Sequence, residues 1–254
     1  TVSIETPAST FTSPISYNNL EINHASAVVK FTGTSGSTMT IGGNLTIKQG
    51  AFEADDGDEN LTVTGDVTVG DGTGSANTAV LGHADDTSAM TFGSLKIDSD
   101  GKYIATSGTT TITKNTGATG GVAFYTHTSG TFTHNSGLMK FTSADADTNV
   151  VGQSVTKNPF YDLEATSTYE PKEANETTVL NNATFANNVT FQDSARYIKV
   201  LGICRFLSGE YNRNNNSTNA NHFFGTLIIE GGTFELAPME ITVGSFRNLG
   251  GTIS

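Results

Sequence analysis

The chain has 254 residues, with 25 acidic and 13 basic side chains and a formal net charge of −12. Only 15% of its residues are charged and 35% are hydrophobic, whereas average globular chains carry about 25% charged and about 45–50% apolar residues. Helix-forming Glu, Lys, Leu and Gln are scarce beside Thr, Val, Ile, Gly and Asn, which excludes a helical bundle. The acidic balance argues against nucleic acid as a partner, and the lack of a long apolar run argues against a membrane.

Short strands with a period of two residues recur along the whole chain. In Gly43-Asn44-Leu45-Thr46-Ile47, the apolar side chains share one face and the polar side chains share the other. The same alternation returns at residues 61–64, 66–69, 94–97, 188–191, 226–229, 233–236 and 241–243. We expect ten side chains of these strands to point into the core: Leu45, Ile47, Val67, Val69, Leu95, Ile97, Val189, Phe191, Leu227 and Ile229.

The spacing of these strands favours a solenoid over a sandwich. A unit of Gly, then Asn, Asp or Ser, then an apolar-polar-apolar strand recurs around Leu45, Val67 and Leu95, in steps of 22 and 28 residues that suit one coil. Leu227, Phe234 and Ile241 are seven residues apart, as three faces of one coil would be. The sequence therefore predicts an all-β, right-handed parallel β-helix (β-solenoid) of short strands, with tandem β-sandwich domains as the alternative.

A longer repeat suggests two units within one stack. Residues 14–22 resemble residues 158–165, with 143 residues between Leu20 and Leu163, and residues 222–228 form a weaker third copy. We expect a first solenoid unit over residues 1–150 and a second over residues 151–254. Neither end carries an obvious polar cap, so we also expect the chain to continue, to be capped by another chain, or to form a homo-oligomer.

Arginine is confined to the last quarter of the chain, whereas acidic residues gather between Glu53 and Asp100. Arginine is enriched at protein interfaces. We expect a partner surface at four residues: Arg196, Arg205, Arg213 and Arg247.

In its composition and its short motifs, the sequence resembles a known class of proteins. The segments Gly130-Thr131-Phe132-Thr133-His134-Asn135-Ser136-Gly137 and Phe160-Tyr161-Asp162-Leu163 look like repeats in Thr/Gly/Asn-rich β-helical surface proteins. Such repeats occur in phage virion fibres and decoration proteins and in bacterial adhesin-like exoproteins. The resemblance implies a location on a virion surface or outside the cell, and other virion or surface proteins as partners.

No residue pattern points to an active site. Asp55, Asp58, Asp98 and Asp100 stand in turn contexts, and alanine at these positions is expected to leave assembly and any glycan processing unchanged. Neither acidic stretch completes a calcium loop, so no cofactor is predicted beyond weak Ca²⁺ binding. The histidines lack metal-ligand spacing, and the apolar surroundings of Cys204 suggest a buried side chain.

Two polar excursions, residues 167–178 and 208–221, are candidates for surface-binding loops. Each carries a tyrosine, Tyr169 or Tyr211, that could stack on a sugar, and a host-surface glycan is the ligand that such loops suggest.

We expect the chain to be a non-enzymatic structural component of an extracellular assembly, in the first place a phage virion surface fibre, tail or capsid decoration protein. A bacterial cell-surface adhesin is the first alternative, and a polysaccharide-degrading tailspike is the second.

Overall fold

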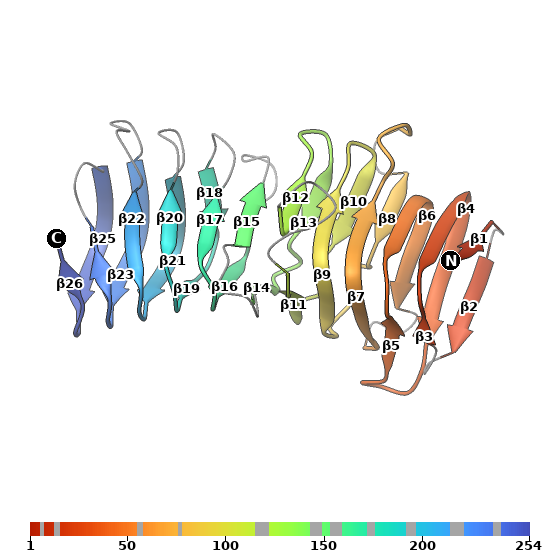
Figure 1. Cartoon of the computed structure of the whole chain (residues 1–254), viewed down its shortest axis with the longest axis horizontal. Helices are drawn as coiled ribbons and strands as arrows, with labels where there is room; N and C mark the ends of the chain where they lie inside the picture. The colour runs from red at the N-terminus through yellow and green to blue at the C-terminus, as the bar shows by residue number, and fades with distance from the viewer. Residues whose placement is uncertain are drawn as a thin grey trace.

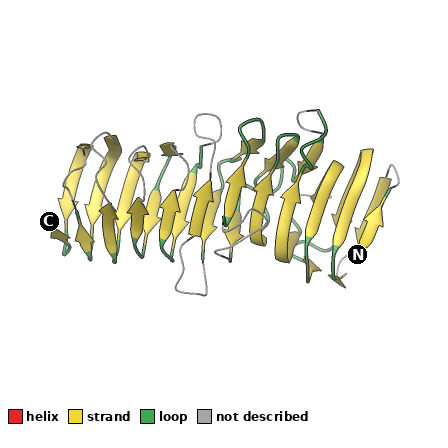
Figure 2. Cartoon of the chain, turned by 45° about the horizontal axis from the view of Figure 1, so that its top comes forward, coloured by secondary structure: helices red, strands yellow, loops and turns green. Residues whose placement is uncertain are grey.

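The structure is a computed structural model that describes residues 1–5, 8–12, 16–54, 58–75, 78–114, 122–142, 149–152, 159–171, 176–191, 197–213, 221–235 and 240–254. Its regular elements are all strands, with no helix in these residues. Every strand pair runs parallel. The strands stack in an elongated rod whose two termini lie at opposite ends (Figures 1 and 2). The predicted all-β solenoid is confirmed, and the sandwich alternative is excluded because its hairpins would pair strands antiparallel.

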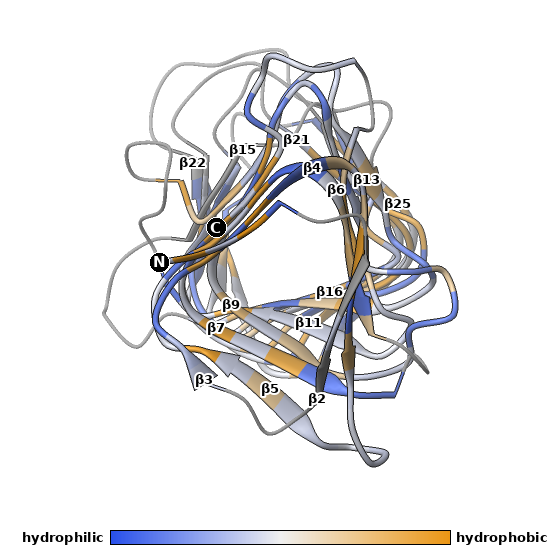
Figure 3. Ribbon diagram, turned by 90° about the vertical axis from the view of Figure 1, so that its right-hand side faces the viewer, coloured by the Kyte–Doolittle hydropathy of each residue, from blue (hydrophilic) through white to orange (hydrophobic). Residues whose placement is uncertain are grey.

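Seen along the rod, the strands form three faces around a common interior (Figure 3). The first face contains β1 (Val2–Ile4), the first part of β4 (Leu20–Thr32) and of β6 (Leu45–Ala54), the last part of β7 (Asn60–Val69) and of β9 (Met90–Ile97), β12 (Phe124–Thr126), β15 (Asn149–Gly152), β17 (Tyr169–Pro171), β20 (Val189–Phe191), β22 (Glu210–Arg213), β24 (Thr233–Phe234) and β26 (Thr252–Ile253). The second face contains β2 (Ala8–Thr12), the last part of β4 and of β6, β8 (Ala79–Leu81), β10 (Gly101–Ile104), β13 (Thr131–Thr133), β18 (Glu176–Val179) and the first part of β21 (Tyr197–Phe206), of β23 (Asn221–Ile229) and of β25 (Glu240–Asn248). The third face contains β3 (Ser16–Tyr17), β5 (Thr38–Ile41), the first part of β7 and of β9, β11 (Thr109–Ile112), β14 (Leu138–Phe141), β16 (Asp162–Ala165), β19 (Ala183–Phe185) and the last part of β21, β23 and β25.

The interior is filled by the apolar members of the period-two strands. Nine of the ten side chains expected in the core are at most 2% exposed, which confirms their predicted direction. The side chain of the tenth, Phe191, lies outside the described residues. Aromatic rings pack on one another along the interior, as where Tyr211 lies parallel to Phe234 with 4.2 Å between ring centroids. Cys204 is buried as expected and lies in an inward row between Ala183 and Leu227.

The recurring Gly-Asn unit forms the corner between the third and first faces. Asn19 Oδ1 accepts the N–H of Asn44 at 2.7 Å, and Asn44 Oδ1 accepts the N–H of Asp66 at 2.9 Å. A Cβ on Gly43 would meet the Asn18 carbonyl oxygen of the preceding coil, so the chain needs glycine there. The corner is therefore made by a side-chain hydrogen bond and a close backbone approach, repeated from coil to coil.

The strand ladders continue across residue 150. Phe124 pairs with Val151, and Leu138 pairs with Asp162, so coils on the two sides belong to one stack. The copies of the longer repeat do not all occupy equivalent positions, because Leu20 starts a strand on the first face whereas Leu163 lies on the third. The division into units 1–150 and 151–254 stays a prediction.

Candidate functional site

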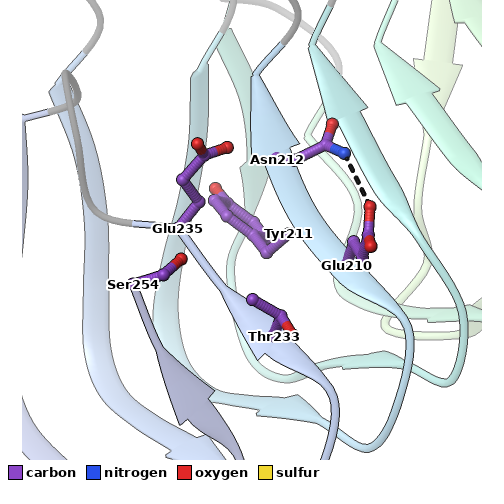
Figure 4. Close-up of a pocket in the computed structure, with 6 residues that line it drawn as sticks. All are labelled: Glu210, Tyr211, Asn212, Thr233, Glu235 and Ser254. Atoms are coloured by element: carbon purple, nitrogen blue, oxygen red, sulfur yellow. Dashed lines mark hydrogen bonds between the residues drawn. The ribbon is translucent and has the colours of Figure 1, made fainter.

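A polar hollow of about 280 Å³ opens on the outside of the rod near its C-terminal end (Figure 4). It lies on the first face, where β22 and β24 run side by side. The residues that line it are Glu210, Tyr211, Asn212, Thr233, Glu235 and Ser254. We call this site the polar hollow.

Two hydrogen bonds hold the β22 side of the polar hollow. Asn212 Nδ2 donates to Glu210 Oε2 at 3.1 Å, and the N–H of Glu210 donates to Asn188 Oδ1 at 2.8 Å. Glu235 follows Phe234, the register partner of Tyr211, so Glu210 and Glu235 are diagonal neighbours on adjacent strands. The carboxylates and the amide together can accept and donate hydrogen bonds to a polyhydroxylated ligand.

A second, apolar hollow of about 170 Å³ opens at the C-terminal end of the rod. The residues that line it are Leu227, Ile229, Phe234, Ile241, Val243, Phe246 and Ile253. Phe246 is 48% exposed and Leu249 is 60% exposed. The strands there, β25 and β26, pair with β23 and β24 on one side only within the described residues. We call this site the end hollow.

Of the four arginines expected at an interface, the structure describes the side chains of Arg205 and Arg247, so the expected partner surface stays a prediction. Arg205 Nη1 pairs with Glu230 Oε1 of the same chain. Arg247 is exposed on the last coil, in the row that also contains Arg205. Arg196 and the side chain of Arg213 lie outside the described residues. Arg247 is therefore the described arginine best placed to meet a partner.

The expectation that Tyr169 and Tyr211 form surface-binding loops is wrong. Both belong to strands of the first face, β17 and β22, and both are at most 1% exposed. Val189 is the register partner of Tyr169 on one neighbouring strand and of Tyr211 on the other, so all three side chains lie in one row that points into the core. The hydroxyl of Tyr211 forms a 2.8 Å hydrogen bond with His222 Nδ1 in the core, which lets a polar ring be buried.

Asp100 is also not in a solvated turn. It is fully buried, and its carboxylate accepts the N–H groups of Gly72 at 2.9 Å and Gly74 at 3.2 Å. Hydrogen bonds from Thr73 lower the pKa of the neighbouring carboxyl, Asp71. The interpretation of Asp100 as a solvated turn residue is therefore wrong, because this carboxylate holds a loop, and the expectation that alanine there leaves assembly and glycan processing unchanged stays a prediction. Asp55 lies outside the described residues.

Two of the described histidines contact neighbouring residues of the fold. His134 stacks on Tyr161 with 5.5 Å between ring centroids, and His127 Nδ1 accepts the N–H of Ser129 at 3.1 Å. In the described part of the chain, no group of three or more His, Cys, Asp or Glu side chains is placed to hold a metal ion.

No protein-family model, no curated protein and no solved structure matches the chain. Across the ranges that the structure describes, no helix has the length and apolarity needed to cross a bilayer.

Sequence reasoning missed the polar hollow because its residues come from strands that are more than 20 positions apart. Glu210 and Thr233 are register partners, and nothing in either local sequence indicates this pairing. One signal was readable: Asn212 and Glu235 each follow an inward aromatic residue, so the period of two places both side chains outward.

Proposed function

We propose that the chain is a non-enzymatic structural segment of an extracellular assembly, in the first place a surface fibre, tail or decoration protein of a phage virion. The observation that carries this proposal is the succession of parallel coils around one apolar core. Coils are hydrogen-bonded to their neighbours through backbone ladders on three faces, which resists bending and separation.

The outer surface supports the same proposal. On the third face, Thr40, Thr62, Thr91 and Thr111 are register partners in four successive coils. Stacked threonines pack their methyl groups and keep their hydroxyls toward water. Such a surface is suited to a soluble rod that resists proteases.

We also propose that further parallel coils stack on the ends of this rod, from a continuation of the chain, from another copy of it or from a different capping chain. The free edges of β25 and β26 present unpaired backbone groups around the end hollow, and β1 and β2 pair only with β4 within the described residues. Parallel strand edges of this kind are templates for a further strand. The apolar side chains of the end hollow add a surface whose burial is favourable.

Electron microscopy and sedimentation of the purified chain at micromolar concentration test the structural proposal. We expect rods of uniform width that lengthen with concentration and resist protease digestion. A monodisperse monomer over days would contradict assembly, and rapid digestion into small fragments would contradict a rigid rod. Antibody labelling then distinguishes attachment to virions from attachment to bacterial cells, as an adhesin would show.

A polysaccharide-degrading tailspike is the second candidate, and the polar hollow is the observation that favours it. Glycosidases use a pair of carboxyl groups, and Glu210 and Glu235 both line this hollow. A screen of host polysaccharides tests this candidate, with Glu210→Gln and Glu235→Gln as variants and Glu164→Gln as the control. Hydrolysis that both hollow variants lose and the control keeps would replace the structural proposal with an enzymatic one.

A further inference from the structure

One histidine lies inside the core and not in a turn. His222 is 0% exposed and belongs to β23. Its register partner on the following coil is Ile241 of β25, and the next residue, Phe223, pairs with Lys199 of β21 on the preceding coil. The imidazole therefore lies in an inward row of the second face, with a coil on each side of it.

Two hydrogen-bonding groups meet at Nδ1 of His222. The hydroxyl oxygen of Tyr211 lies 2.8 Å from this nitrogen, and the N–H of Ile198 donates to it at 3.3 Å. A main-chain N–H can only donate, so Nδ1 must be the ring nitrogen without a proton. The fold therefore selects the neutral imidazole, with its one proton on Nε2.

The titratable groups that the structure places on this side of the ring are uncharged. Tyr211 faces it edge to face from β22, with 5.7 Å between ring centroids, and the Cys204 thiol of β21 acts on Tyr211 in turn. Burial raises the pKa of both groups, so the phenol and the thiol keep their protons at neutral pH. β25 places the apolar Ile241 in register with the ring, and Phe224 is the next inward side chain of β23 itself.

A second proton on the ring would break this arrangement. An imidazolium carries N–H on both nitrogens, so its Nδ1–H would face the N–H of Ile198, donor against donor. The Tyr211 hydroxyl can turn to accept, but the main-chain group cannot. The positive charge would also lie in the core, and burial of an ion away from water is unfavourable.

We propose that His222 is an acid-sensitive switch: its neutral ring holds β21, β22 and β23 together, and its protonation opens these coils while the coils before them stay stacked. In an opened segment, a histidine takes up its proton near pH 6.5, whereas the core opposes protonation of the ring. The open form binds more protons, so the stability of these coils is complete above about pH 6.5 and falls as the pH drops. Opening can stay local because each coil contacts only its neighbours.

Amide hydrogen exchange of the whole chain at pH 7.5 and pH 5.0 tests the proposal. The rates are expressed as protection factors, which removes the pH dependence of the exchange chemistry itself. We expect β21 and β23 of the wild type to lose protection at pH 5.0 by up to about 30-fold, the limit that uptake of one proton allows between the two pH values. The reference strands β11 and β14 should keep theirs.

His222→Asn removes the titration and keeps an acceptor near the same place. The amide oxygen of asparagine can accept from Tyr211 and Ile198 but takes up no proton, so protection of β21 and β23 should be equal at the two pH values. His24→Asn is the matched control, because His24 Nδ1 also accepts a main-chain N–H, from Ser26 at 3.3 Å, but at a partly exposed position. This control should keep the full effect of pH.

Tyr211→Phe gives a second test that keeps both the histidine and the aromatic ring stacked on Phe234. The neutral imidazole loses one of the two hydrogen bonds that favour it, so the pH at which β21 and β23 lose protection should rise. Tyr169→Phe is the control, because Tyr169 is an equally buried tyrosine of the same inward row on a different coil. It should leave that pH unchanged.

Four results would overturn the proposal. The first is equal protection of β21 and β23 in the wild type at pH 7.5 and pH 5.0. The second is a loss in His222→Asn as large as in the wild type, and the third is a loss of the same size in β11 and β14, which would indicate general acid unfolding. The fourth is an unchanged transition in Tyr211→Phe. None of these results bears on the structural role of the rod, because a solenoid can serve that role without an acid switch.

Discussion

Asp86 and Asp100 are both acidic residues in turns, and the fold gives them opposite surroundings. Asp100 accepts backbone N–H groups from a glycine-rich loop, which satisfies its buried charge. Asp86 has one paired oxygen and one unpaired oxygen, and burial raises its pKa to about 6. A carboxyl in a turn can therefore hold a loop or carry an uncompensated charge, depending on the N–H groups around it.

The raised pKa of Asp86 predicts a pH dependence of stability. Its folded pKa, about 6, exceeds the ordinary value of 3.8, so folding favours the protonated form. The stability that this carboxyl contributes is complete below about pH 4 and is lost as pH rises through about 6. We expect the free energy of unfolding of the wild type to fall across this window by up to roughly 3 kcal/mol relative to Asp86→Asn.

Denaturant unfolding at a series of pH values measures this difference. Because other carboxyls titrate in both proteins, the comparison with Asp86→Asn isolates the one group. His83, Glu53 and Glu59 are the charged groups that act on it, so His83→Gln is expected to change the midpoint of the effect but not its direction. A difference that grows with rising pH in favour of the wild type would contradict the assignment.

Asp100→Ala is expected to destabilise the fold. The substitution removes the buried acceptor of the N–H groups of Gly72 and Gly74, which lie in an exposed loop. The loss should be about 1.5–3 kcal/mol, the usual contribution of a hydrogen bond to a charged group. Asp85→Ala, at an exposed carboxylate, should change the unfolding midpoint little in the same urea titration.

At the scale of the strand and its corner, neighbouring glycines have different roles. A Cβ on Gly43 would contact the backbone of Asn18 and the side chain of Asn19 closer than real Cβ atoms approach other atoms. A Cβ on Gly42 would lie 3.6 Å from the nearest atom, the carbonyl oxygen of Tyr17, which is ordinary contact. The two residues are adjacent and both meet the preceding coil, yet only at Gly43 is the approach too close for a Cβ.

Gly43→Ala should therefore destabilise the chain by about 1–3 kcal/mol, the usual effect of an overpacked contact, whereas Gly42→Ala should be nearly neutral. Both variants reduce the entropy of the unfolded chain equally, so their difference reports the close approach alone. Thermal unfolding of the two proteins side by side measures it. Equal midpoints would show that the corner can widen without cost.

Period-two alternation predicted which side chains are buried, because one side of a solenoid strand faces the solvent and the other faces the core. It did not predict which strands are neighbours, since the register depends on corner lengths that range from one residue to long excursions. For the same reason Tyr169 and Tyr211 looked like loop residues: their strands are three to four residues long and lie among polar sequence. The inward position of Glu59 could have been read from Leu61 and Val63, which continue its alternation.

At the scale of the whole molecule, the end hollow predicts how assembly responds to mutation. Phe246→Glu places a charge among apolar side chains that stacking would bury, so association should weaken strongly. Leu201→Glu is the matched control, because Leu201 is similarly exposed, at 45%, but lies on β21 within the rod. Sedimentation velocity over a range of concentrations compares the two. Equal loss of association in both variants would show that copies meet along their sides.

Parallel stacking also determines how the molecule comes apart. Each coil pairs only with the coil before it and the coil after it, so its stability is the sum of its own terms and two nearest-neighbour interfaces. Local unfolding then requires the least free energy at a coil that has a single neighbour. It proceeds inward from there one coil at a time. Amide hydrogen exchange should accordingly be fastest at β1 and β26 and slowest near β9 and β14, as a gradient along the axis rather than one global rate.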